Sequence, residues 1–243
     1  SFKESSKIKI SMAHHDEITE LPGGPLVWMA GIIYGKVEEN YKFGVGTHLG
    51  DFKNTPYYDK LKEIYEALQN HRGFKEFVKA KTLPNCDFFV PDPGFIVEFD
   101  ESQHFTQPRI ITLKNYPENL ELGFDKGRWI KLCAKIKAKD NDPPYRDEQR
   151  AWYDTLRDFL PAIKNLKPTI RLFANDYMWC SFAPNNSSDV KRFENILKGA
   201  SESWEIEVRE EQNPSVARII ITGDWEGNPI EAKQLLEDIC EKW

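Results

Sequence analysis

The sequence predicts an α/β protein with a mixed central sheet flanked by helices. Two short apolar runs rich in β-forming residues, 86–90 and 95–99, flank a Pro-Asp-Pro-Gly turn, which is the pattern of a β-hairpin. Apolar residues at three- and four-residue spacing indicate helices before and after this hairpin. A further apolar run at 169–174 indicates another strand. Helices that alternate with strands in this way are typical of the α/β class.

Composition limits the classes of protein to consider. The chain has 243 residues, 40% of them hydrophobic and 13% aromatic, which is ordinary for a globular protein with a substantial core. The longest apolar run, at 25–33, is too short to span a bilayer, and no segment has the pattern of a signal peptide. We therefore expect a cytoplasmic protein without a membrane partner. The four cysteines lie far apart, which favours buried free thiols over a disulfide framework or a zinc site.

The first part of the chain, residues 1–54, is expected to be an extension containing strands. Apolar runs at 26–34 and 41–45 indicate two strands around a polar Glu-Glu-Asn turn. Thr55 and Pro56 then match the N-cap and first position of a helix. The apolar positions of this helix are Tyr58, Leu61, Ile64, Tyr65 and Leu68, and Gly73 ends it.

Beyond the hairpin, residues 106–113 are expected to form a strand or loop interrupted by Pro108. A helix is expected at 124–140, with one apolar stripe and several basic faces. Its basic residues either contact phosphates or form a solvated face that balances nearby acids. The candidates for nucleic-acid contacts on this helix are Lys126, Arg128, Lys131 and Lys135.

Another helix is expected to begin at Tyr145, and the strand at 169–174 follows it. Residues 184–243 are then predicted to form a C-terminal α-β-β-α extension. It comprises a helix from Asp189, strands at 204–208 and 216–222, and a last helix from Pro229. Three roles stay open for this extension: enlarging the sheet, forming a homodimer contact, or binding DNA or a protein partner.

The hairpin carries the candidate site. Alternate residues of a strand share one face, so Glu98 and Asp100 are expected to point the same way, with Asp87 beside them on the paired strand and His104 close behind. Converging carboxylates suit Mg²⁺ or Mn²⁺, which prefer oxygen ligands. The alternative is that each acid is simply solvated at a strand end. The net charge of −6 argues against indiscriminate nucleic-acid binding but leaves room for a local basic face.

Asp87, the hairpin turn and the run Val97-Glu98-Phe99-Asp100-Glu101-Ser102-Gln103-His104 resemble the PD-(D/E)XK, or restriction-endonuclease-like, superfamily of nucleases. The closest likeness is to its small branch akin to very-short-patch mismatch-repair endonucleases, whose second strand ends in Glu-x-Asp-Gly-x-x-His. In this chain Glu101 replaces the glycine. The helix motif Asp-x-x-Arg at 147–150 and the strand Ile170–Phe173 also resemble that branch. The likeness covers residues 55–173, about half of the chain, and implies a nuclease-like core at 55–183.

The resemblance implies a metal-dependent DNA endonuclease of restriction or repair type. Asp87, Glu98 and Asp100 would be metal ligands, and His104 a general base or a phosphate donor. Gln103, Arg150 or Arg171 would supply the positive charge of the missing lysine. Arg150 would also contact nucleic acid, although Arg150 and Arg171 would equally serve the fold by pairing with acids. Glu63 on the preceding helix is a supporting candidate. The rival hypothesis is a catalytically inactive nuclease-like module that binds nucleic acid or a protein partner.

Overall fold

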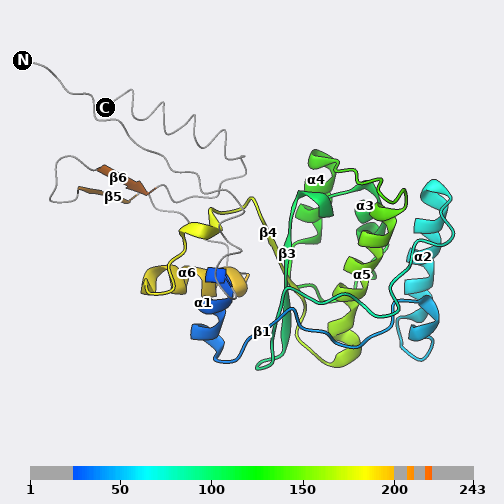
Figure 1. Ribbon diagram of the computed structural model, residues 1–243, viewed down its shortest axis with the longest axis horizontal. Coiled ribbons are helices and arrows are strands. Elements are labelled where there is room, and N and C mark those ends of the chain that lie inside the picture. The colour runs from blue at the N-terminus through cyan, green and yellow to red at the C-terminus, as the bar shows by residue number, and fades with distance from the viewer. Residues whose placement is uncertain (1–23, 200–206, 211–216, 221–243) are drawn as a thin grey trace, which may run out of the picture. The chain divides into compact units, whose positions relative to one another are not determined.

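The structure, a computed structural model, describes residues 24–199, 207–210 and 217–220 (Figure 1). The described chain divides into two compact units. The larger unit is Val27–Trp179, and it holds most of the predicted core at 55–183. The described residues from Cys180 onward belong to the smaller unit. The candidate site lies entirely in the larger unit.

A four-stranded mixed sheet confirms the α/β class. Its strands are β1 (Glu38–Glu39), β2 (Phe88–Val90), β3 (Phe95–Asp100) and β4 (Ile170–Phe173), in the order β1-β2-β3-β4. The predicted hairpin forms, with β2 antiparallel to β3, and Gly94 adopts the positive φ of +89° that its turn requires. Strand β4 runs parallel to β3 and places Arg171 directly opposite Glu98.

Four helices of the larger unit gather on one side of this sheet (Figure 1). They are α2 (Tyr58–Arg72), α3 (Gln107–Lys114), α4 (Lys126–Ile136) and α5 (Arg146–Lys164). Helix α2 buries the predicted residues Leu61, Ile64 and Leu68 and ends at Gly73 in the left-handed conformation. Two 3-10 turns, η2 (Leu49–Phe52) and η3 (Ser102–His104), also belong to this unit.

Helix α5 is the central helix of the core. Its apolar side is buried, with Trp152, Leu156, Phe159 and Leu160 each at most 1% exposed. The helix also buries most of its charged side chains, which was not predicted from the sequence. Because a buried charge costs several kcal/mol unless a partner compensates it, these side chains must be paired within the protein.

One segment predicted as a strand and one predicted as a strand or loop are helices. The run 26–34 forms α1 (Gly24–Tyr34), whose second residue is Pro25, a residue well suited to a first helical turn. The run 106–113 forms most of α3, because the Thr106 side chain accepts a hydrogen bond from the Arg109 amide and Pro108 lies in the first turn. The expected strand at 41–45 is also absent, and the short strand β1 forms where a turn was predicted.

The C-terminal part begins with η4 (Trp179–Ser181) and α6 (Ser187–Leu197). Asn186, and not the predicted Asp189, caps α6. Strands β5 (Glu207–Glu210) and β6 (Ala217–Ile220) pair antiparallel, and the helix predicted from Pro229 lies outside the described residues. None of the described helices combines the length and apolar composition needed to cross a bilayer.

Candidate functional site

Strand β3 places both of its acids in a buried, arginine-rich environment. Glu98 and Asp100 are 5% and 1% exposed, and each faces a guanidinium group. Arg157 Nε of α5 lies 2.9 Å from Glu98 Oε1. Asp100 accepts hydrogen bonds from Arg171 Nη1 at 2.6 Å and from the indole nitrogen of Trp129 at 2.7 Å. The solvated-acid alternative is therefore wrong for these two residues.

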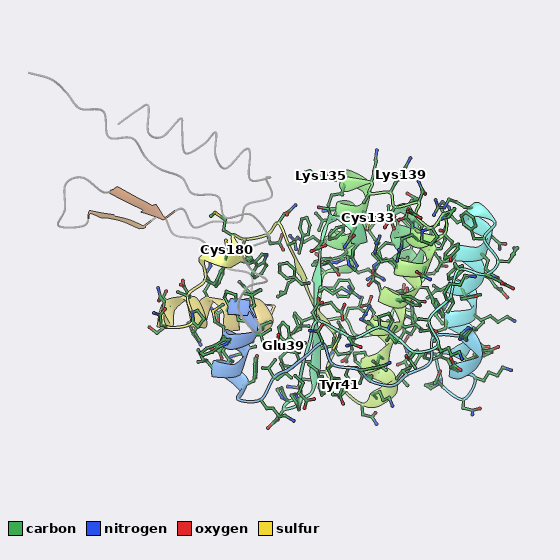
Figure 2. All side chains as sticks on the ribbon, viewed as in Figure 1. Glu39, Tyr41, Cys133, Lys135, Lys139 and Cys180 are labelled. Carbon is green, nitrogen blue, oxygen red and sulfur yellow. The ribbon has the colours of Figure 1, made fainter. Side chains whose placement is uncertain are left out.

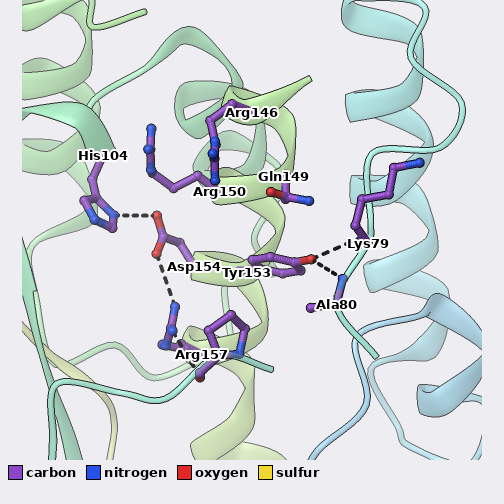
Figure 3. Close-up of a pocket in the computed structure, with 10 residues that line it drawn as sticks. Lys79, Ala80, His104, Arg146, Gln149, Arg150, Tyr153, Asp154 and Arg157 are labelled. Carbon is purple, nitrogen blue, oxygen red and sulfur yellow. Dashed lines mark hydrogen bonds and ion pairs between the residues drawn. The ribbon is translucent and has the colours of Figure 1, made fainter. Parts of the chain in front are cut away.

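His104, at the end of η3, lies against two carboxylates. Its Nδ1 atom is 3.0 Å from Oδ2 of Asp154 and 3.6 Å from Oδ1 of Asp100 (Figure 3). Each of the three side chains offers a ligand atom, and these atoms lie within 4.8 Å of one another. Among the described residues this is the one group of at least three histidine, cysteine or acidic side chains arranged to hold a metal ion. We call Asp100, His104 and Asp154 the central triad.

Asp154 was not among the site residues predicted from the sequence. It lies on α5, 50 residues from His104, and its carboxylate is 1% exposed. The helix carries two Asp-x-x-Arg runs seven residues apart, and the one that faces the hairpin is Asp154–Arg157, not Asp147–Arg150. Two turns of helix separate equivalent positions seven residues apart, so both runs lie on the same side of α5. This repeated charged face of α5 is the feature of the sequence that indicates Asp154 as a site residue.

The charges around the central triad do not balance. Four buried carboxylates, Glu98, Asp100, Asp154 and Asp158, share three buried guanidinium groups, those of Arg109, Arg157 and Arg171. Such a cluster favours an additional proton. Burial raises the pKa of Glu98 to about 8 despite the nearby charge of Arg157. Burial opposes the charged form of His104, but the negative charges of Asp154 and Asp100 outweigh burial and raise its pKa.

The attraction between His104 and Asp154 that raises the pKa of the imidazole lowers the pKa of the carboxyl group. Burial alone would raise the pKa of this carboxyl, but the charges of His104 and Arg171 hold the pKa well below its ordinary range. Asp154 is thus ionised at neutral pH. Its Oδ1 atom is buried and has no hydrogen-bond partner, although Arg171 Nη2 lies 3.7 Å away. A buried carboxylate oxygen left without a hydrogen bond is a place where a further cation would gain free energy.

Other predicted site residues lie outside the central triad. Asp87 is exposed, and its carboxylate accepts a hydrogen bond from the Phe99 amide at 2.6 Å. Gln103 is exposed and accepts a hydrogen bond through its backbone oxygen from Arg150 Nη1 at 3.0 Å. Glu63 pairs with Lys60 on the exposed face of α2. None of Asp87, Glu98 and Glu63 belongs to the group of ligand atoms within 4.8 Å, and Glu63 does not line the cavity beside the central triad.

The basic helix α4 presents most of its predicted residues to solvent. Lys131 and Lys135 are exposed, Lys126 is half-buried, and Arg128 pairs with Asp176. None of the four lines the cavity beside the central triad.

A cavity of about 390 Å³ opens beside His104 and Asp154 (Figure 3). Four cations line it: Arg146, Arg150 and Arg157 from α5, and Lys79 from the loop between α2 and β2. Asp154 is the one acid among its lining residues. Tyr153 shapes the wall, where its hydroxyl accepts hydrogen bonds from the amides of Lys79 and Ala80. We call this space the cationic cavity, and its charge suits a phosphate group.

The central triad fits a divalent cation by its donor chemistry. The imidazole offers one nitrogen ligand and the two carboxylates offer one oxygen ligand each. Asp154 Oδ1 has no hydrogen-bond partner and is available to a cation. Imidazole with carboxylates favours Mn²⁺ over Mg²⁺, because Mg²⁺ prefers oxygen ligands. The guanidinium of Arg171 already neutralises part of this charge.

Comparison of the chain with protein families, curated proteins and solved structures finds no match. Function must therefore be inferred from the geometry of the site.

Proposed function

We propose that the protein hydrolyses phosphodiester bonds in nucleic acid, with DNA as the expected substrate, at the central triad and with a divalent cation. One observation carries the proposal. An ionised carboxylate and an imidazole 3.0 Å apart form one wall of a cavity whose other charged side chains are all cationic. Metal ligands next to an anion-binding cavity are the two components that hydrolysis of a phosphodiester requires.

The central triad would hold the cation. Asp100, Asp154 and His104 would be its ligands, which retains Asp100 and His104 from the sequence-based site and adds Asp154. A bound divalent cation supplies charge stabilisation for the transition state and makes a water molecule more acidic at neutral pH. Only a neutral imidazole binds a metal, so the raised pKa of His104 makes cation binding compete with a proton.

The cationic cavity would bind and orient the substrate phosphate. Arg150 is held by Asp140 at 3.0 Å and by the backbone of Gln103, so its guanidinium is preorganised at the cavity wall. Arg157 is held by the carbonyl oxygens of Pro84 and Asn85. Fixed guanidinium groups stabilise developing negative charge at little entropic cost.

The order of the surrounding elements also supports a nuclease-like core. A helix (α2), a hairpin ending in Glu98 and Asp100 (β2 and β3), a helix with Asp-x-x-Arg (α5) and a strand with Arg171 (β4) follow one another as the resemblance to PD-(D/E)XK nucleases implies. Strands β3 and β4 are neighbours, which brings these motifs together.

The second candidate function is a nucleic-acid-binding or protein-binding module without catalysis. It is favoured by the pairing of Glu98 with Arg157 and of Asp100 with Arg171, because guanidinium groups then neutralise acids that a metal would need. The two candidates predict different outcomes in the presence of Mn²⁺.

The test is incubation of the protein with supercoiled plasmid and with short labelled duplexes in Mn²⁺ or Mg²⁺, comparing the wild type, Asp154→Asn and Glu63→Gln. We expect cleavage by the wild type and by the exposed-helix control Glu63→Gln, and a loss of at least a hundredfold in Asp154→Asn. Binding of the duplex by all three proteins without cleavage would support the module instead.

A further inference from the structure

A second cavity, of about 520 Å³, lies between the C-terminal ends of α2 and α4 and the start of α3. None of its lining residues lines the cationic cavity. Its volume is in the range of about 300–1,000 Å³ typical of small-molecule sites. The cavity is therefore a separate candidate binding site, and we call it the second cavity.

The floor of the second cavity is apolar. Pro108 and Ile110 of α3 are buried, as is Cys133 of α4, and Ala134 and Ala138 complete this surface. Burial raises the pKa of Cys133 to about 12, so its thiol stays neutral and packs as a small apolar group. Such a floor accepts the flat, weakly polar face of an aromatic ring system.

The mouth is cationic. Lys137 and Lys139 follow α4, His71 lies in the last turn of α2, and all three are exposed (Figure 2 labels Lys139 and Cys133). Within the described chain none of the three side chains forms an ion pair, whereas the neighbouring Arg72 is occupied by Glu148 and Asn141. In a protein with a net charge of −6, the unpaired lysines at the rim of an apolar cavity favour an anionic ligand.

Two carboxamides also line the cavity, together with the buried carboxylate of Asp147, which lies 3.8 Å from Arg72 and 3.9 Å from Arg150. Gln107 is exposed at the start of α3. Asn141 accepts a hydrogen bond from Arg72 Nη1 through Oδ1 at 2.7 Å, which leaves its amide hydrogens for a ligand. Carboxamides both donate and accept, and asparagine and glutamine are the side chains that pair with base edges.

From this arrangement we propose that the second cavity binds a nucleotide unit, with the base on the apolar floor and the phosphate at Lys137 and Lys139. The unit comes either from a free mononucleotide or from a nucleic-acid strand, since both present the same chemistry. Binding here does not depend on hydrolysis at the central triad, so the two proposals fail separately.

The test is isothermal titration calorimetry on the full chain without metal, using AMP, adenosine, inorganic phosphate and a pentanucleotide as probes. We expect AMP or the pentanucleotide to bind at least tenfold more tightly than adenosine or phosphate, because base and phosphate both contribute. Binding of AMP assigns the site to free nucleotides, and binding of the pentanucleotide alone assigns it to a strand.

Two variants and a matched control locate the binding. The pair Lys137→Gln and Lys139→Gln should weaken binding at least tenfold, while Lys62→Gln with Lys164→Gln removes the same charge from exposed positions on α2 and α5 that line neither cavity and should change it less than twofold. Ala134→Trp fills the cavity from an exposed position and should abolish binding. The proposal is overturned if no probe binds at millimolar concentration, if phosphate alone binds as tightly as AMP, or if the control pair loses as much affinity.

Discussion

His104 and Asp154 lie 50 residues apart in the chain, yet Nδ1 of the imidazole is 3.0 Å from Oδ2 of the carboxylate. The contact joins the turn after β3 to the middle of α5. It gives the imidazole an ionised partner that is 1% exposed. The first prediction below and the Mn²⁺ titration at the end depend on this pair.

Replacing Asp154 by Asn should lower the pKa of His104. Burial opposes the imidazolium, and the charge of Asp154 is the main influence that raises the pKa, so its removal leaves burial dominant. In the wild type, the raised pKa stabilises the fold below pH 6.5, and this contribution is lost as pH rises through the folded-state pKa. NMR titration of the His104 ring measures the shift, with Glu63→Gln as the control. An unchanged pKa in Asp154→Asn would contradict this account.

Replacing Glu98 by Gln should change how stability depends on pH. The folded-state pKa of about 8 exceeds the ordinary value of 4.5, so the folded protein retains a proton that the unfolded chain releases. This contribution is complete below pH 4.5 and is lost as pH rises towards 8, at about 1.4 kcal/mol for each pKa unit. Glutamine does not ionise, so the variant should gain stability relative to the wild type between pH 5 and 9.

Urea denaturation across that pH range measures the difference in the free energy of unfolding. Glu63→Gln, at an exposed site, serves as the control and should show no such trend. A Glu98→Gln variant whose stability relative to the wild type stays constant across that range would show instead that Glu98 is already ionised at pH 5, as its pairing with Arg157 would favour.

Arg171 should be far more important for stability than Arg128. Its buried guanidinium pairs with Asp100 at 2.6 Å and with Asp158 at 2.8 Å. Arg171→Met leaves both carboxylates without this partner and should destabilise the protein by about 3–5 kcal/mol. Arg128→Met removes a half-exposed pair with Asp176 and should cost about 1 kcal/mol or less. Thermal unfolding of the two variants gives the comparison, and equal losses would count against a buried charge network.

Gly123 is expected to tolerate no side chain. A Cβ atom there would lie 2.6 Å from the carbonyl oxygen of Thr169, in the backbone that leads into β4. Gly123→Ala should therefore destabilise the protein by about 1–3 kcal/mol. The control is Gly31→Ala in α1, where a Cβ meets nothing within 4 Å and helix propensity should raise stability by up to about 1 kcal/mol. Chemical denaturation measures both, and a stable Gly123→Ala variant would contradict the close approach.

Local patterns predicted the hairpin, helices α2 and α5 and strand β4, because turn residues and apolar spacing specify each of them within a few residues. They failed for α1 and α3. The apolar run of α1 has no periodicity that separates a strand from a helix, and Pro108 was taken as a breaker although Thr106 makes it part of a first turn.

Two of the three residues of the central triad, Asp100 and His104, were among the site residues predicted from the sequence. Asp100 and His104 lie four residues apart, so their proximity follows from the local chain. Asp154 joins them only because α5 packs beside β3, which is tertiary information. The arginine partners of Glu98 and Asp100 likewise come from α5 and β4. Of the two, Arg171 was named from the sequence as a residue that would pair with acids, whereas Arg157 was not.

The most direct test of the central claim is a Mn²⁺ titration followed by electron paramagnetic resonance, which measures free Mn²⁺ in the presence of the protein. We expect the wild type and Glu63→Gln to bind one Mn²⁺ with the same affinity, and Asp154→Asn and His104→Gln to lose that affinity at least tenfold. A wild type that binds no Mn²⁺, or variants that bind it as tightly as the wild type, would show that Asp100, His104 and Asp154 are not a metal centre.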